Sequence, residues 1–142
     1  MAAFDPIHST DLIQSVIQQQ MAAFNKEDYP TAYTLASKSI RQRLSKERFE
    51  TMVRSGYPQI ANSHLVSFGE TLFSDDTQAA VATVHVTGKD HVTVIARYLM
   101  VLEGEGWKIN GVTIVEEFQP IRSGPAGRRS ARSRESERLC HL

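Results

Sequence analysis

Cysteine is almost absent from this chain of 142 residues, because Cys140 is the only one. A single cysteine excludes an intramolecular disulfide and gives no cysteine-based zinc site. Scarce cysteine is typical of a reducing compartment, so we expect a cytoplasmic protein. We expect no metal and no cofactor, since a chain of this length buries enough surface to fold without them.

Long apolar runs and an early basic segment are also absent. The segment 1–25 contains no Lys or Arg, and glutamines interrupt the apolar run between Leu12 and Phe24. This pattern predicts neither a secretory signal nor a transit peptide. No run reaches the roughly 18 apolar residues that a membrane-spanning helix needs. We therefore expect no membrane association.

An excess of charge of one sign is missing, because 16 basic residues balance 16 acidic ones. The balance conceals an asymmetry: residues 1–122 hold 11 basic and 14 acidic residues, whereas 123–142 hold five Arg and two Glu. A body with a net charge of −3 does not attract polyanions, so we expect no nucleic-acid partner for the folded part. The Arg-rich end, residues 121–142, lacks apolar periodicity and is predicted to be a disordered tail.

Sequence motifs for several chemistries are lacking as well. There is no G-x-S-x-G nucleophile elbow and no glycine-rich phosphate loop. No two histidines have the helical spacing of a metal site. These absences leave acid–base chemistry in a pocket as the enzymatic option.

The first half of the chain carries helical patterns. Apolar residues recur at helical spacing over 11–24, and Asp28 can cap a second helix in which Pro30 lies in the first turn. Residues 39–44 predict a short helical turn, and Ser45 can cap a helix that continues to Ser55. The pair Tyr57-Pro58 predicts an extended exit from that helix.

The second half reads as strands. Residues 64–73, 78–87, 91–102 and 107–118 are rich in Val, Ile, Thr and aromatic residues and are joined by short connectors. Short connectors favour antiparallel neighbours. The pattern predicts an α+β domain over 9–120, with N-terminal helices packed on a curved four-stranded antiparallel sheet.

Three segments resemble a known bacterial family: IQQQMAAFNKEDYPTAYTLASKSIR, FETMVRSGYPQI and YLMVLEGEGWKINGVTI. They are similar to domain of unknown function 4864, which looks like part of the nuclear-transport-factor-2-like superfamily. The terminal pattern of Gly106, Trp107, Ile109, Gly111 and Val112 carries the superfamily likeness. The resemblance implies a cone-shaped fold with a pocket, but no activity, because this fold serves many functions.

Aromatic and polar residues on the predicted sheet and helices are the candidates for lining such a pocket. A mixed lining would suit a small apolar or anionic ligand. His85 is the candidate acid–base group for a pocket enzyme, although a structural role is the alternative. The candidates are Tyr29, Tyr33, Tyr57, His85, Arg97, Tyr98 and Trp107.

Arg97 stands out because it interrupts the apolar strand VTVIARYLMVL. If Val94 and Tyr98 face one way, Ile95 and Arg97 face the other. Arg97 then needs a carboxylate, for which Glu70 is one candidate, or an anionic ligand, or a polar partner in a dimer interface. The last two strands are apolar on both faces, which favours a homodimer through the sheet.

These patterns lead to two functional hypotheses. The first is a non-enzymatic module that binds a small ligand or another protein. The alternative is a pocket isomerase or lyase that acts on a small apolar substrate by acid–base catalysis. The two differ in whether a titratable group lies inside the pocket.

Overall fold

A computed structural model of the chain describes residues 6–104 and 106–118. The predicted Arg-rich tail, 121–142, and Cys140 lie outside the described residues. The prediction that this segment is disordered therefore stays a prediction.

The first half of the chain forms five helices among the described residues: α1 (Pro6–Asn25), α2 (Tyr29–Thr34), α3 (Lys38–Arg43), α4 (Lys46–Gly56) and α5 (Pro58–Ala61). Three begin at side-chain caps: Asp28 accepts from the amide of Thr31, Ser37 from that of Ile40, and Ser45 from that of Arg48. Each cap satisfies an amide that the first helical turn leaves unbonded. Two of these caps, Asp28 and Ser45, are the ones that the sequence predicted.

Two helix boundaries differ from the prediction. Helix α1 begins at Pro6, five residues earlier than expected, because proline is tolerated in the first helical turn. The expected extended exit after Tyr57 was wrong, since Pro58 opens the short helix α5. Tyr57 itself has the non-helical backbone that a residue before proline requires, with φ −134° and ψ 59°.

The second half forms a four-stranded sheet: β1 (Ser63–Phe73), β2 (Ala79–Gly88), β3 (Thr93–Glu103) and β4 (Gly106–Phe118). Each strand pairs antiparallel with its neighbour in chain order. Short connectors permit this order because antiparallel strands need only a turn between them. The predicted α+β class and strand order are confirmed.

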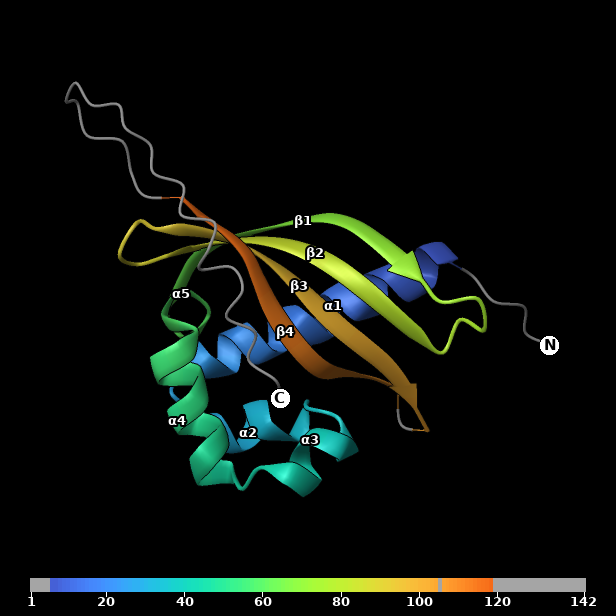
Figure 1. The fold of residues 1–142 in the computed structure, drawn as a ribbon, viewed down its shortest axis with the longest axis horizontal. Helices are drawn as coiled ribbons and strands as arrows, with labels where there is room; N and C mark the ends of the chain where they lie inside the picture. Colours follow the sequence, from blue (N-terminus) through green and yellow to red (C-terminus); the bar gives the residue numbers. More distant parts are fainter. Residues whose placement is uncertain (1–5, 105, 119–142) are drawn as a thin grey trace.

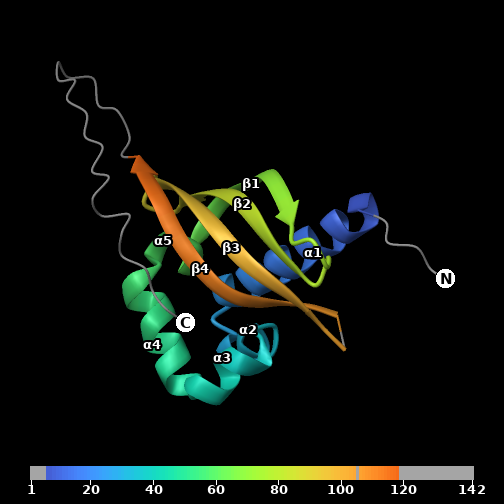
Figure 2. The same cartoon turned by 45° about the vertical axis from the view of Figure 1, so that its right-hand side comes forward.

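The helices lie on one side of the curved sheet, and α1 runs beneath it (Figures 1 and 2). Alternate side chains of β2 and β3 point toward these helices, and Val84, Val94, Ala96 and Tyr98 are at most 1% exposed. The other side of the sheet, which we call the outer sheet face, carries the intervening residues. The core therefore occupies the space between the sheet and the helices.

Within the two described ranges, no helix is long and apolar enough to cross a membrane. Among the same residues, no group of three or more potential metal ligands comes together.

Candidate functional site

A small cavity of about 20 Å³ lies between the sheet and the helices. Helices α1, α3, α4 and α5, the segment before α3, and strands β3 and β4 all contribute to its wall. The lining is mostly aliphatic and aromatic, as is usual for small-molecule sites. The lining residues are Gln20, Phe24, Ala36, Ile40, Phe49, Met52, Val53, Tyr57, Ile60, Tyr98, Ile109 and Val112. We call this space the Tyr98 cavity.

Tyr98 is a lining residue of this cavity and carries an unpaired hydroxyl. Its side chain is fully buried on β3, opposite Ala82 and Val112 of the neighbouring strands. Its hydroxyl has no hydrogen-bond partner among the described residues. Leaving a buried hydroxyl unpaired costs about 1–3 kcal/mol. Burial also raises the pKa of the Tyr98 phenol far above its ordinary value, so the group stays neutral and can donate a hydrogen bond.

Two other polar side chains of the lining already have partners. The amide nitrogen of Gln20 donates to the carbonyl of Ala32 at 3.0 Å, and the hydroxyl of Tyr57 donates to the carbonyl of Val112 at 2.8 Å. These bonds tie α1 to α2 and the start of α5 to β4. The Tyr98 hydroxyl is therefore the hydroxyl of the lining that is still available for a hydrogen bond to a bound molecule.

The cavity lining suits binding more than proton transfer. None of the described lining residues is a carboxylate, a histidine or a lysine. The titratable groups among them are the phenols of Tyr57 and Tyr98. A phenol held neutral by burial can donate a hydrogen bond, but it is a poor base at neutral pH.

Of the seven residues that the sequence singled out, Tyr57 and Tyr98 line the cavity together. Tyr29 and Tyr33 lie outside it. Tyr29 packs on Phe24 with ring centroids 5.3 Å apart. The hydroxyl of Tyr33 lies within hydrogen-bonding distance of the carbonyls of Arg41 and Leu44, so it holds α2 against the end of α3.

Trp107 is also separate from the cavity lining. It is buried at the start of β4 and meets the ring of Phe73 edge-on, with centroids 6.0 Å apart. This contact packs the two edge strands across the inner side of the sheet. Trp107 therefore contributes to the core.

His85 and Arg97 lie on the outer sheet face, away from the cavity. Both side chains are exposed, and they pair across the strands with Ile95 and Thr83. The expected salt bridge between Arg97 and Glu70 does not form, and Arg97 has no ion-pair partner within the described ranges. The hypothesis that Arg97 binds an anion inside the pocket does not fit this position, because the Arg97 side chain is on the side of the sheet opposite the cavity. What remains for Arg97 is a role on the outer surface.

Sequence reasoning missed Gln20, Met52 and Val53 as lining residues. Gln20 is 3% exposed and follows Ile13 and Ile17 on the same face of α1. This helical spacing was the available signal, because a glutamine on an apolar stripe is buried with the stripe. Met52 and Val53 gave no comparable signal, since any apolar helix face has residues of this kind.

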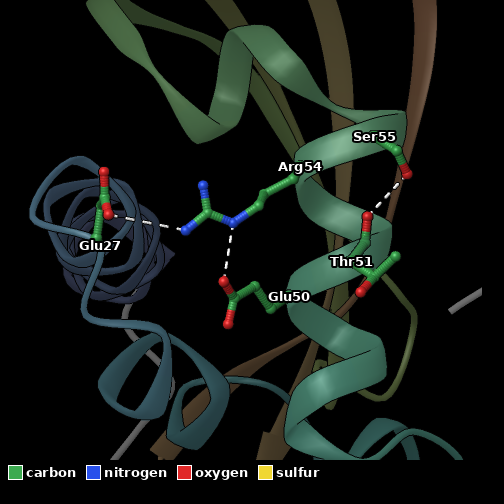
Figure 3. A network of polar contacts seen from close by, with 5 residues as sticks. All are labelled: Glu27, Glu50, Thr51, Arg54 and Ser55. Atoms are coloured by element: carbon green, nitrogen blue, oxygen red, sulfur yellow. Dashed lines mark hydrogen bonds and ion pairs between the residues drawn. The ribbon is translucent and has the colours of Figure 1, made fainter.

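The α4 wall of the cavity is held from outside by Arg54 (Figure 3). Its Nε donates to Glu50 at 2.8 Å, and its guanidinium lies 3.8 Å from a carboxylate oxygen of Glu27. The same guanidinium lies 4.8 Å from the ring centroid of Tyr29. Because these groups are largely exposed, solvent weakens the ion pairs. We expect this contact to orient α4 without locking it.

Comparison with known families matches residues 8–121 to the family described as Domain of unknown function (DUF4864). The chain belongs to this family. The match covers all described helices and strands except the first two residues of α1, so the DUF4864 domain and the folded unit coincide. No curated protein shows significant sequence similarity to the chain.

Among solved structures, this DUF4864 chain is similar to the intermembrane space region of the chloroplast protein ARC6. The two share 14% sequence identity and superpose with a TM-score of 0.50, over 80% of this chain and 98% of the other. At this identity the likeness concerns the fold alone. It is consistent with the cone-shaped arrangement of helices and sheet expected from the sequence.

Proposed function

We propose that this DUF4864 domain is a non-enzymatic interaction module that forms a homodimer through its outer sheet face. One observation supports the proposal most: an apolar face of the sheet is left uncovered by any described helix (Figure 1). Leu65, Leu72, Leu99 and Phe118 lie on it and are 39–60% exposed. Large apolar side chains gathered on one face usually mark an interaction site.

The size of the face supports a second copy as its partner. Four strands about 4.8 Å apart and ten residues long, at about 3.3 Å per residue, give a face on the order of 600 Å². Two such faces would bury about 1,200 Å², the lower end of the range for stable protein interfaces. A second copy is a suitable partner because, in a two-fold dimer, both copies contribute the same surface patch.

Charged groups on the face also fit a self-complementary partner. Arg97 lies near the centre of the face and has no ion-pair partner among the described residues, and Glu116 is exposed on the same face, opposite Ile95. In the proposed dimer, the carboxylates of each copy would lie near Arg97 of the other copy. Such charges fix the orientation of a complex more than its affinity.

The alternative function, a pocket isomerase or lyase, has less support. The proposed acid–base group, His85, is exposed on the outer sheet face, and the described cavity lining offers neither carboxylate nor imidazole. Acid–base catalysis requires a titratable group within reach of the substrate. The geometry therefore favours binding over catalysis.

Three finer proposals accompany this function. The pattern of Gly106, Trp107 and Ile109 supports membership of the nuclear-transport-factor-2-like superfamily, and the likeness to the bacterial family supports a bacterial origin. The single cysteine supports a cytoplasmic location.

The dimer is tested by placing a charge in the middle of the outer sheet face. Leu99→Arg should convert a dimer into a monomer, because the arginines of the two copies would meet in an apolar interface. Sedimentation velocity on the full chain across a wide range of concentrations measures the change. Circular dichroism checks that the variant is folded.

Leu12→Arg is the matched control. Leu12 lies on α1 and is 44% exposed, close to the 39% of Leu99, but it is not part of the sheet. We expect this variant to remain dimeric. A parent chain that stays monomeric at high concentration, or a dimer that survives Leu99→Arg, would contradict the proposal.

A further inference from the structure

We infer that the Tyr98 cavity binds a small uncharged molecule that is apolar except for one hydrogen-bond acceptor, such as a ketone or ether oxygen. This binding function is separate from the outer-face dimer, since the cavity lies on the opposite side of the sheet. Tyr98 would donate the hydrogen bond, and the aliphatic and aromatic lining would hold the rest of the molecule.

The unpaired hydroxyl of Tyr98 is the first part of the argument. The side chain is 0% exposed and the hydroxyl lacks a partner among the described residues. Buried hydroxyls in folded proteins are almost always hydrogen-bonded. An acceptor supplied by a bound molecule would complete the missing bond.

The lining sets the remaining chemistry of the ligand. Gln20 donates one amide hydrogen and Tyr57 its hydroxyl hydrogen to backbone carbonyls, and the other lining residues apart from Tyr98 are apolar. A charged ligand would find no counter-ion among the described lining residues, and transferring an unpaired charge from water is very costly. A neutral molecule with a single acceptor matches the one hydroxyl that is available.

An ordered water is the competing occupant. The cavity of about 20 Å³ has room for roughly one water molecule. However, a buried water typically makes about three hydrogen bonds, and this lining offers few groups besides Tyr98. An apolar molecule with one acceptor uses both the hydroxyl and the surrounding hydrocarbon, whereas a water gains nothing from the hydrocarbon.

A ligand larger than water requires the cavity to widen, and a small shift of α4 would widen it. Phe49, Met52 and Val53 all come from this helix. Met52 is half-buried, and a methionine side chain adapts readily to a new shape. The exposed Arg54 contacts that hold α4 from outside permit a small displacement.

The experiment compares two probes of nearly equal shape, cyclopentanone and methylenecyclopentane, in which a CH₂ group replaces the carbonyl oxygen. Each is titrated into the ¹⁵N-labelled full chain, and amide shifts are followed for β3, β4 and α4. Cyclopentanone should bind saturably and shift the amides of Tyr98, Val112 and Met52. Tyr98→Phe should weaken cyclopentanone binding by roughly 2- to 10-fold, the worth of one hydrogen bond, and leave methylenecyclopentane binding unchanged or tighter.

Two variants serve as controls. Tyr33→Phe removes a hydroxyl that lies outside the cavity lining and is already bonded to the carbonyls of Arg41 and Leu44, so it should not change the preference between the probes. Leu99→Arg should bind both probes like the parent chain, which separates a failure of the dimer from a failure of this site.

Absence of saturable binding of cyclopentanone to the parent chain would overturn the inference, as would shifts confined to residues away from the cavity. Equal weakening of both probes by Tyr98→Phe would also overturn it, because the hydroxyl would then not select the acceptor.

Discussion

At the scale of single residues, burial without a partner distinguishes Tyr98 from the other aromatic residues. Tyr57 and Tyr33 are also packed into the domain, but each hydroxyl lies against a backbone carbonyl. A tyrosine with an unpaired hydroxyl at a fully buried strand position carries a cost in stability that phenylalanine would not have. A hydrogen bond from this hydroxyl to a bound ligand would account for the cost.

Tyr98→Phe should therefore leave the free energy of unfolding unchanged or raise it by up to about 1 kcal/mol, because it removes an unpaired polar group and keeps the ring. Tyr57→Phe should lower the same quantity by about 1 kcal/mol, because it breaks a formed hydrogen bond. Urea denaturation of the ligand-free chain compares the two variants. A clear loss of stability in Tyr98→Phe would mean that the hydroxyl is bonded in the folded protein.

At the scale of elements, the short segment before α3 joins the helical layer to the sheet. The amide of Ser37 donates to the carbonyl of Ile109, and the amide of Ile109 donates to the carbonyl of Leu35. The Ser37 hydroxyl accepts from Ile40 at the start of α3 and lies 2.7 Å from the side-chain oxygen of Asn110 on β4. This joint brings Ala36 and Ile40 to the cavity.

The two serine caps of α3 and α4 provide a matched comparison of this joint. Ser37→Ala should lower the free energy of unfolding by about 1–3 kcal/mol, since it removes a cap and leaves Asn110 without its donor in a part-buried place. Ser45→Ala, at an exposed cap, should cost about 1 kcal/mol or less. Thermal and urea unfolding of both variants measure the difference. Equal losses would mean that the bond to Asn110 contributes little.

At the scale of the whole molecule, the helices cover one side of the sheet and leave the other free. The folded unit therefore offers two separate surfaces for binding, a cavity inside and a face with exposed apolar residues outside. Strand β4 contributes to both, because Ile109 and Val112 line the cavity while Glu116 and Phe118 are on the outer sheet face. The residues named on both surfaces lie within the described part of the chain, which ends at Phe118.

Deletion of residues 123–142 should therefore leave the melting temperature of the chain nearly unchanged. The described core ends with β4 at Phe118, and the family match ends at residue 121. Differential scanning calorimetry of the two chains at equal concentration gives the comparison. A fall of more than a few degrees would show that the deleted segment packs on the domain.

Much of the fold could be predicted from local patterns. The alternation in β3 correctly put Tyr98 and Arg97 on opposite faces, because successive side chains of a strand point to opposite sides, but it did not say which face is buried, and both residues were expected in the pocket. The same rule applied to β2 puts His85 outside, since Val84 and Val86 are buried on either side of it. Caps and short turns gave the order of the elements.

The sequence by itself determined the α+β class and the strand order, because both follow from local spacing, but it left open which face of each strand is buried. Only the tertiary structure decided which residues surround the cavity. Phe24, Met52, Tyr98 and Val112 come from four separate elements. Whether their side chains fill the shared space or leave a gap depends on how those elements pack. The missing partner of the Tyr98 hydroxyl is likewise a property of the assembled core, because hydrogen-bond partners in a core come from segments distant along the chain.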